Sequence, residues 1–440
     1  MYPLGHIERS RRRVDSKLAA KRTRGARVIT PLARIKAVKV LFVFLSFALC
    51  VPSAFAQTAT PWQFAFDANQ NLVMPNAQGV PTRRFLIGLY DTSGYGGTVA
   101  WWSNQLTYVL SGDNTDATDA ADGYVDVYLN YFQGASPASN RVAIGQACAL
   151  RGMAYLDTEN QNNSNIWDTS TNPPTLITSY LAPIVQAEVG RPGMLGAYTA
   201  DEPCNDPNKS GNYNQVSQLH KFYDTYWPGG VQFGVMRANE PLYVYNAAND
   251  TCSAPGYDYT GVMSQQLGAL GTDPYLLYWA RPLENIVNFL PYTLSWANSY
   301  GKRVKPYWYV QQFWGYSNGI DGWPTQDQMR RESWTAICMG VNGIFYWSFG
   351  AMGLSYVAEP QRSTLFNEWL AVIKEIKSYE PALTGTPVAL PETLPRGVIG
   401  IARETSDGVT HVFTINASGM TISDSNGHRW QPHQTIFWTE

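Results

Sequence analysis

The sequence predicts an α/β fold: a (β/α)8 barrel, or TIM barrel, followed by a small C-terminal β appendage. Eight short runs rich in β-branched and aromatic residues alternate with longer segments of helical periodicity, which is typical of parallel strands joined by crossover helices. Most of these runs are nearly continuous in apolar residues, as expected of strands that are buried on both faces. A change to a Pro-rich linker and alternating strands from about residue 381 predicts the appendage.

The expected elements follow one another regularly along the chain. Several strands are followed at once by polar, glycine, proline or acidic residues, and in a closed parallel barrel these positions converge on one face. The clearest helix begins after Thr325, an N-cap residue with Gln328 three positions later, and another covers residues 365–379. The eight expected barrel strands are residues 85–90, 125–132, 152–156, 194–199, 232–236, 270–275, 303–310 and 343–347, and the appendage strands are residues 398–402, 410–416 and 435–438.

Residues 1–56 are typical of an export signal. A basic stretch at residues 9–39 precedes an apolar run at residues 40–51 and the small-residue site Ala54-Phe55-Ala56. The apolar run is about 12 residues long, shorter than the roughly 20 that a membrane-spanning helix needs, so we expect no stable membrane anchor. The mature protein, secreted or periplasmic, would contain a catalytic barrel at residues 57–380 and a small β domain at residues 381–440 packed on the barrel.

Composition restricts the partners of the mature chain. Residues 1–56 hold 12 Lys and Arg against 2 Asp and Glu, so 20 basic and 32 acidic residues remain and the formal charge is −12. This balance argues against nucleic acid as a partner.

No His or Cys spacing resembles a zinc site, and we expect no metal and no cofactor. Cys204 and Cys252 lie in polar loops that a disulfide would join, whereas Cys148 and Cys338 lie in apolar helical stretches and are expected to be free thiols.

The sharpest local motif is Asp201-Glu202-Pro203, at the end of the fourth expected strand. A carboxylate there would lie at the mouth of the barrel, and Pro203 would end the strand and fix the turn, so that the acid is held in place. Hydrolysis of a glycosidic bond needs a proton for the leaving oxygen and a second group that stabilises or attacks the oxocarbenium-like centre. Glu202 fits the first role. The alternative is that Asp201 and Glu202 merely cap the following helix.

Four segments together resemble barrel glycoside hydrolases whose fourth strand ends in Asp-Glu-Pro. They are residues 194–203, the run Leu-Gly-Thr-Asp-Pro-Tyr ending at Tyr275, Gln311-Gln312-Phe-Trp314, and the run Gly-Val-Asn-Gly-Ile-Phe-Tyr-Trp ending at Trp347. The resemblance covers roughly residues 83–380. Over this range the chain is similar both to clan-A-like enzymes and to substrate-assisted hexosaminidases. It implies that Glu202 is the general acid/base.

The identity of the second catalytic group stays open. The seventh strand ends in Gln311-Gln312, at the position where the large retaining clan carries a nucleophilic glutamate. An adjacent Asp201-Glu202 pair resembles that of substrate-assisted N-acetylhexosaminidases, in which the two acids act together. Asp273, at the end of the sixth strand, is an alternative base or nucleophile. Glu240 or Asp91 is a third choice. A catalytically inactive carbohydrate-binding barrel is the remaining interpretation.

Several further residues near the strand ends are expected to bind substrate. Aromatic rings stack on sugar faces but also fill cores, and alternation along the seventh strand places Trp308 on the face opposite Tyr307 and Tyr309. Gln312 suits binding of a hydroxyl group, whereas Asp157 and Glu159 are expected to be surface or supporting acids. The expected substrate-binding residues are Asp91, Tyr198, Glu240, Tyr275, Trp308, Gln312, Trp314 and Trp347.

The function that these patterns predict is a secreted glycoside hydrolase that cleaves a polysaccharide or oligosaccharide, with Glu202 as general acid and Asp201 or Asp273 as its partner. The expected partner molecule is a carbohydrate substrate, and the expected state is a monomer.

Overall fold

The computed structural model describes most of residues 64–440 and divides the chain into two units, Met1–Gln57 and Thr58–Glu440. The predicted signal region and its cleavage site lie outside the described residues. Further positions that are not described are residues 77, 93–96, 112–120, 122, 132–136, 204–211, 238–243, 247–250, 254–266, 277–284, 289, 292–293, 295–305, 316–321 and 351–353.

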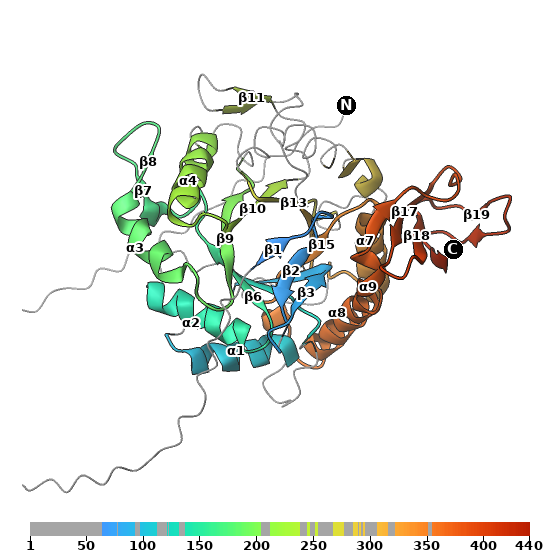
Figure 1. Cartoon of the computed structure of the whole chain (residues 1–440), viewed down its shortest axis with the longest axis horizontal. Helices are drawn as coiled ribbons and strands as arrows, with labels where there is room; N and C mark the ends of the chain where they lie inside the picture. The colour runs from blue at the N-terminus through green and yellow to red at the C-terminus, as the bar shows by residue number, and fades with distance from the viewer. Residues whose placement is uncertain are drawn as a thin grey trace, which may run out of the picture. The chain divides into compact units, whose positions relative to one another are not determined.

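Eight parallel strands form a closed barrel, as the sequence predicts (Figure 1). Each strand overlaps one of the eight expected runs, and every neighbouring pair is parallel. The fold is therefore a (β/α)8 barrel. The strands, in their order around the barrel, are β4 (Leu86–Asp91), β5 (Val127–Asn130), β6 (Ala154–Thr158), β9 (Met194–Asp201), β10 (Val231–Arg237), β13 (Ala269–Asp273), β14 (Tyr307–Gln312) and β15 (Gly343–Trp347).

The strands bury both faces because side chains alternate between the barrel interior and the surrounding helices. Inside, Phe233 stacks on Phe345 with ring centroids 5.2 Å apart. Gly88 makes room for this ring, since a Cβ atom at that position would overlap the Phe345 side chain. The outward residues, such as Ile344, pack into a larger apolar cluster with the helices. Two apolar layers therefore hold the strand ends in place.

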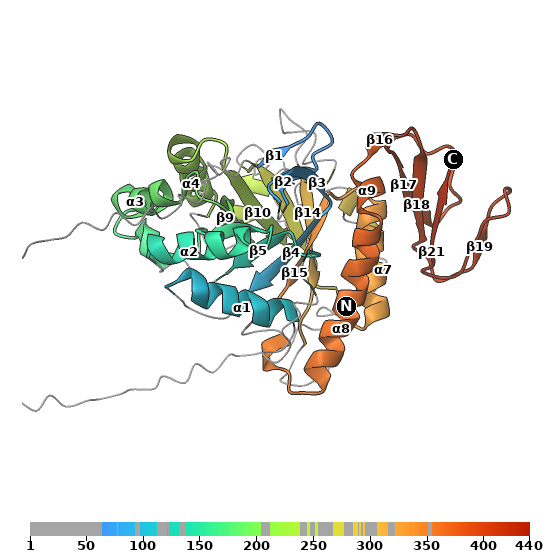
Figure 2. The same cartoon turned by 60° about the horizontal axis from the view of Figure 1, so that its bottom comes forward.

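The described helices lie around the barrel in Figures 1 and 2, and one of them starts at the capping box that the sequence predicts. The helix predicted after Thr325 begins there: Thr325 Oγ1 accepts a hydrogen bond from Gln328 N at 3.3 Å, and Thr325 N donates to Gln328 Oε1 at 2.9 Å. Within the described part of the chain, every helix is too short or too polar to span a bilayer. The helices are α1 (Val99–Ser111), α2 (Ala138–Ala149), α3 (Thr178–Glu188), α4 (Asn212–Tyr226), α7 (Gln326–Cys338), α8 (Gln361–Ser378) and α9 (Glu380–Leu383).

An N-terminal meander that the sequence analysis did not identify closes the amino end of the barrel. It leads directly into β4, and its Leu72 and Met74 belong to the inner apolar cluster of the barrel. Phe66 contacts Trp308 with ring centroids 6.1 Å apart. The opposite, carboxyl end of the strands is therefore the end that remains for a functional site. The meander strands are β1 (Ala65–Phe66), β2 (Leu72–Pro75) and β3 (Pro81–Arg84).

A C-terminal antiparallel sheet packs against α7 (Figure 2), and it contains the three strands expected in the appendage. Trp334 of α7 stacks on Phe413 at 6.0 Å and lies 4.6 Å from Phe437, as measured between ring centroids. Because barrel and sheet belong to one compact unit, the domain boundary at residue 380 stays a prediction. The sheet strands, in order, are β16 (Thr386–Val388), β17 (Val398–Glu404), β18 (Thr410–Asn416) and β21 (Thr435–Thr439).

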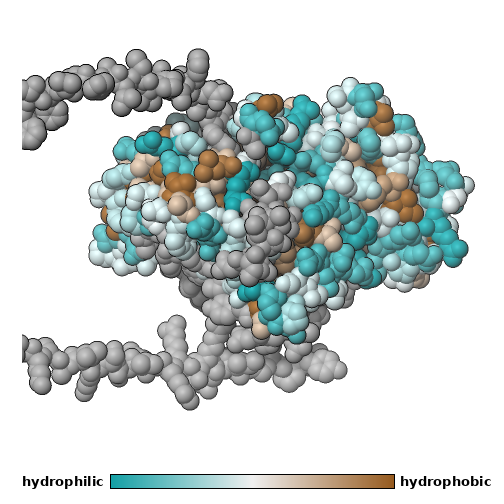
Figure 3. Space-filling view, turned by 90° about the horizontal axis from the view of Figure 1, so that it is seen from below, coloured by the Kyte–Doolittle hydropathy of each residue, from teal (hydrophilic) through white to brown (hydrophobic). Residues whose placement is uncertain are grey.

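Short strands and 3-10 turns lie in the loops between the main elements. A hairpin of β19 (Ile422–Ser423) and β20 (Arg429–Trp430) belongs to the C-terminal region. The remaining pairs are β7 (Trp167–Asp168) with β8 (Thr175–Leu176) and β11 (Val244–Asn246) with β12 (Thr251–Ser253), and the 3-10 turns are Ser164–Ile166 and Leu354–Tyr356. On the face seen in Figure 3, the described apolar residues form small separate patches within polar surface. The expected monomeric state stays a prediction.

Candidate active site

Three carboxylates lie at the carboxyl ends of two barrel strands. Asp201 is the last residue of β9 and Glu202 follows it, while Asp273 is the last residue of β13. Because the strands are parallel, these ends share one face of the barrel, which is where barrel enzymes carry their active sites. One strand, β10, separates β9 from β13.

Asp201 is held by hydrogen bonds to both of its carboxylate oxygens. Tyr198 Oη donates to Oδ1 at 2.6 Å, Tyr131 Oη donates to Oδ2, and Asn162 Nδ2 donates to Oδ2 at 3.0 Å. The amide of Gln161 also binds the backbone of Asp201: Asp201 N donates to Gln161 Oε1 at 3.0 Å, and Gln161 Nε2 donates to the Asp201 carbonyl. These contacts fix the position of the carboxyl group.

Two opposing effects act on the protonation of Asp201. Burial raises the pKa of this carboxyl, because the charged form loses hydration. The hydrogen bonds from Tyr131, Tyr198 and Asn162 lower the pKa, because they favour the charged form. Burial has the larger effect, so the pKa lies above the ordinary value for an aspartic acid.

Glu202 occupies an unusual backbone conformation at the strand end. Its φ of 39° lies in the left-handed region, which costs a residue other than glycine about 1–2 kcal/mol. Its backbone N–H donates to the carbonyl of Val235 at 2.9 Å, and the residue is half-buried. Tyr275, two residues after Asp273, also has a positive φ, of 41°. Such conformations cluster at functional sites, and both residues follow carboxyl ends of barrel strands.

The charges of the three carboxylates raise the pKa of two phenols, the buried Tyr90 and the half-buried Tyr275. Burial raises the pKa of Tyr275, and the charges of Asp273 and Glu202 raise it further. Burial also raises the pKa of Tyr90, as do the charges of Asp201 and Asp273. Asp273 is 4% exposed, and strand alternation from the inward-facing Ala269 directs its side chain to the barrel interior. The arrangement can therefore supply two acids to one bound molecule.

Aromatic rings surround these acids. Trp347, at the end of β15, lies 4.6 Å from Tyr131 and 5.0 Å from Tyr90 between ring centroids, in edge-on arrangements. Trp314 lies 6.1 Å from Tyr275 in the same way. Trp347, Trp314 and Tyr275 are half-buried and keep surface available to a ligand. Tyr198 is 1% exposed, so its contribution to the site is its hydroxyl group.

The structure places Trp308 in the barrel core and not at the mouth. Alternation does direct it inward, with Tyr307 and Tyr309 on the outer face. However, Trp308 is 1% exposed and lies 4.8 Å from Phe233 and 5.7 Å from Phe345 between ring centroids. A ring enclosed in this way has no free face for a sugar, which corrects the expectation that Trp308 is a substrate platform.

Asp91 also departs from its expected role. It is fully buried, and its side chain points outward from the barrel, where Tyr128 Oη donates a hydrogen bond to it and Gln105 Nε2 of α1 lies at 3.5 Å. The reason is alternation, because Tyr90 takes the inward position immediately before it. Asp91 therefore joins a strand to a helix. Glu240 lies outside the described residues.

The two glutamines at the end of β14 have structural contacts. Gln312 Nε2 donates to the carbonyl of Trp314 at 2.9 Å and to that of Gly322 at 3.3 Å, so it orders the loop that follows the strand. Gln311 faces outward, and its Nε2 donates to the carbonyl of Met329 at 3.0 Å. Gln312 lies at the carboxyl end of the barrel, but its side-chain nitrogen already donates hydrogen bonds to backbone carbonyls.

Asp157 and Glu159 are supporting acids, and they are buried instead of exposed. Both form ion pairs with Arg141 of α2, and Glu188 of α3 lies 3.9 Å from the same guanidinium group. All four side chains are fully buried. Burial raises the pKa of Glu159 to about 7. This cluster joins β6 to the helices outside the barrel.

Sequence reasoning missed Tyr131, Gln161 and Asn162. All three follow the carboxyl ends of β5 and β6, so the rule that located Glu202 would also have found them. Cys148 and Cys338 are buried free thiols, as predicted. The side chains of Cys204 and Cys252 lie outside the described residues, so their disulfide stays a prediction.

No family model and no curated protein matches this chain. Solved structures with a similar fold include a GH27 β-L-arabinopyranosidase from Geobacillus stearothermophilus, with a TM-score of 0.45, 11% identity, and 80% of this chain and 95% of that chain covered. An endo-1,4-β-mannanase from Rhizomucor miehei has a TM-score of 0.46, 8% identity, and 71% and 100% covered.

An exo-β-1,4-mannosidase from an Opitutaceae bacterium has a TM-score of 0.44, 12% identity, and 71% of this chain and 63% of that chain covered. These three proteins are glycosidases. At these identities and TM-scores the similarity says nothing about activity. The fold assignment rests on the strand pairing, and the candidate site rests on the residues described above.

Proposed function

We propose that the protein is a secreted glycoside hydrolase that cleaves a polysaccharide or oligosaccharide. The observation that carries the proposal is the convergence of Asp201, Glu202 and Asp273 at the carboxyl end of the barrel, beside half-buried aromatic rings. Most glycoside hydrolases use two carboxyl groups that flank the scissile bond, and aromatic faces bind sugar rings. The three acids and the neighbouring rings support the proposal.

Glu202 is proposed as the general acid. It is half-buried and follows the strand end, so it can exchange protons with solvent and reach a leaving oxygen. Asp273 is proposed as its catalytic partner, acting as base or nucleophile. Adjacent strands lie about 4.8 Å apart, so β9 and β13, with β10 between them, lie roughly 10 Å apart and leave room for a sugar between the acids. Carboxyl separations of about 5–10 Å are those of glycosidases.

Asp201 is proposed as a positioning group next to Glu202. Both of its oxygens accept hydrogen bonds from Tyr131, Tyr198 and Asn162, so its carboxyl cannot rotate freely toward a reacting atom. A fixed carboxyl group can still orient a substrate hydroxyl or N–H group through its remaining lone pairs. Its negative charge would also stabilise the oxocarbenium-like centre.

The test is a screen of the purified mature chain against polysaccharides with and without N-acetyl groups. Glu202→Gln and Asp273→Asn should each lower the rate of sugar release by about 10²–10⁴-fold, since each removes a proton-transfer or nucleophilic group. Asp407→Asn, in an exposed turn of the C-terminal sheet, is the matched control and should be fully active. A wild-type chain that cleaves no glycan, or acid variants that cleave as fast as wild type, would contradict the proposal.

A carbohydrate-binding barrel without activity is the second candidate. The observation in its favour is that β14 ends in two glutamines, with Gln312 donating to loop carbonyls. This candidate predicts glycan binding without cleavage. Binding should then be lost in Trp347→Ala and unchanged in Glu202→Gln.

A further inference from the structure

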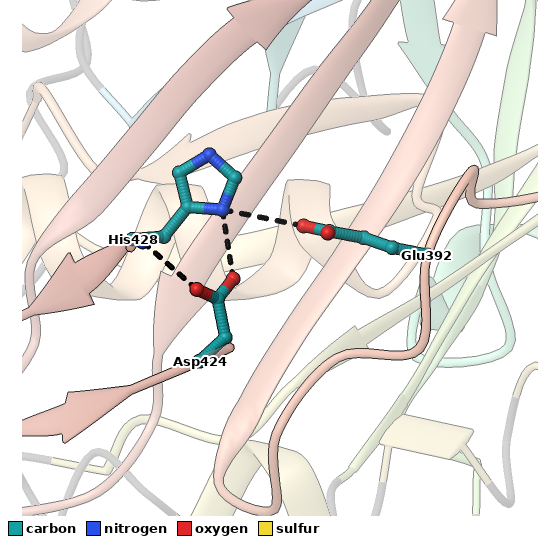
Figure 4. A group of neighbouring side chains, drawn as sticks. All are labelled: Glu392, Asp424 and His428. Carbon is teal, nitrogen blue, oxygen red and sulfur yellow. Dashed lines mark hydrogen bonds and ion pairs between the residues drawn. The ribbon is translucent and has the colours of Figure 1, made fainter. Parts of the chain in front are cut away.

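Three side chains capable of binding metal converge in the C-terminal region, at the sheet that packs on α7. Glu392 comes from the segment between β16 and β17, whereas Asp424 and His428 lie on either side of the turn that joins β19 to β20 (Figure 4). His428 Nδ1 lies 2.7 Å from Asp424 Oδ2 and 3.3 Å from Glu392 Oε1. One ligand atom from each residue lies within 4.8 Å of the other two.

The 3.3 Å separation between His428 Nδ1 and Glu392 Oε1 matches an edge of a metal coordination shell, and the 2.7 Å separation between His428 Nδ1 and Asp424 Oδ2 lies just below the range of such edges. Metal bonds to nitrogen and oxygen are about 2.0–2.2 Å long, so neighbouring ligands of one ion lie roughly 2.8–3.6 Å apart. The donor set is one imidazole nitrogen and two carboxylate oxygens. Such a mixed set favours a transition metal, because Ca²⁺ and Mg²⁺ prefer shells made only of oxygen.

Other protein groups already orient the two carboxylates. Asp424 Oδ1 accepts hydrogen bonds from the backbone N–H groups of Asn426 and His428, at 2.9 and 2.8 Å. Glu392 Oε2 accepts a hydrogen bond from the side chain of Asn426. Glu392 Oε1, by contrast, is buried and accepts no hydrogen bond from the described residues, although it points at His428. Outer contacts of this kind hold metal ligands in place.

The imidazole ring is oriented as well. It stacks on Trp438 with centroids 4.6 Å apart and an interplanar angle of 25°, and Trp430 lies 5.6 Å away. Figure 4 shows Nδ1 facing the two carboxylates and the other ring nitrogen pointing away from them. The His428 side chain is 30% exposed, which leaves access for an ion and its water ligands.

We propose that Glu392, Asp424 and His428 bind a divalent transition-metal ion such as Zn²⁺. The ion would sit between His428 Nδ1, Asp424 Oδ2 and Glu392 Oε1, and water would complete its shell. Two carboxylates and a neutral imidazole carry a charge of −2, which the ion neutralises. It would join the segment that precedes β17 to the β19–β20 hairpin, and so stabilise this part of the chain independently of the proposed glycosidase site.

The experiment uses the intact mature chain, treated with EDTA, dialysed and titrated with zinc chloride by calorimetry. We expect one equivalent of Zn²⁺ to bind, a rise in the melting temperature, and no comparable binding of calcium chloride. Glu392→Gln and His428→Gln should each weaken Zn²⁺ binding by at least about 10–100-fold. His411→Gln, in β18 of the same sheet, is the matched control and should bind Zn²⁺ as wild type does.

A variant that preserves the turn guards against misfolding as the cause of lost binding. Asn at position 424 keeps an oxygen that can accept from the backbone N–H groups of Asn426 and His428, but it removes the charged ligand. Asp424→Asn should therefore keep the melting temperature of the metal-free protein and lose the increase caused by Zn²⁺. A wild-type chain that binds no Zn²⁺, or variants that bind it as tightly as wild type, would overturn the proposal.

Discussion

Tyr198 and Asp201 lie three residues apart in β9, and the Tyr198 hydroxyl donates to Asp201 Oδ1 at 2.6 Å. In a regular strand, residues three apart point to opposite faces. The pairing of β9 with β10 shifts by one residue here: Tyr198 is opposite Phe233, and Ala200 is opposite Gly234. Thr199 is the extra residue of this bulge. It turns Asp201 into the barrel interior, on the same side as Tyr198.

Deleting Thr199 should leave Asp201 facing the barrel interior and keep the proposed hydrolysis, because Asp201 would then lie two residues after Tyr198 in a regular strand. The measurement is sugar release together with circular dichroism to confirm that the barrel still folds. Thr199→Ala keeps the residue count and the bulge, so it should retain activity. A deletion variant that folds but releases no sugar would show that the bulge does more than set the direction of Asp201.

Tyr131→Phe and Tyr198→Phe should each lower activity by about 10-fold, since a hydrogen bond to a charged group contributes roughly 1.5–3 kcal/mol. Each change also removes a contact that lowers the pKa of Asp201, so the pKa should rise further. The acidic limb of the pH–activity profile should then move to higher pH. Tyr180→Phe, a partly exposed position on α3, is the control for the substitution type. Unchanged pH profiles in both site variants would exclude a role for Asp201 charge.

Glu332→Gln should change how stability depends on pH. Burial raises the pKa of Glu332, a fully buried residue of α7, from 4.5 to about 7, although the hydrogen bond from Tyr309 at 2.7 Å lowers it. The folded protein therefore binds this proton more tightly than the unfolded chain does. Its contribution to stability is fully present below pH 4.5 and is lost as the pH rises to about 7.

The measurement is urea unfolding of wild type and Glu332→Gln between pH 4.5 and 8. The variant should lose stability less steeply over this range, because glutamine stays neutral. Glu159, whose pKa burial also raises to about 7, leaves a residual slope of the same sign. Glu368→Gln, at a partly exposed position of α8, should follow wild type. Parallel curves for wild type and Glu332→Gln would refute the titration of Glu332.

Trp308 and Trp347 should respond differently to truncation. Trp308→Ala should destabilise the fold by about 3–5 kcal/mol, because the ring fills the barrel core. Trp347→Ala should instead weaken glycan binding with a smaller loss of stability, since the ring is half-buried beside the acids. Chemical denaturation and a binding assay on both variants separate the two effects. Equal losses of stability would place Trp347 in the core as well.

Much of the barrel could be predicted because its signals are local. Each buried strand is a short apolar run, and the Thr325 capping box marks the start of α7 through residues three apart. The position of Asp201, Glu202 and Asp273 at one face also follows from parallel strands alone. The meander before β4 was missed, because its strands are two to four residues long and two of them carry charged or proline residues.

The sequence by itself determined the eight strands, because periodicity is a property of the local chain, and the alternation of strands with helices predicted a parallel barrel with the acids at one face. Only the tertiary structure decided where individual side chains point. The Asp91 side chain points outward because of regular strand alternation. The Asp201 side chain points inward because of a bulge, which only the pairing of β9 with β10 reveals. Contacts between distant segments, such as Tyr131 with Asp201 and Glu392 with His428, require the closed fold because no local pattern encodes them.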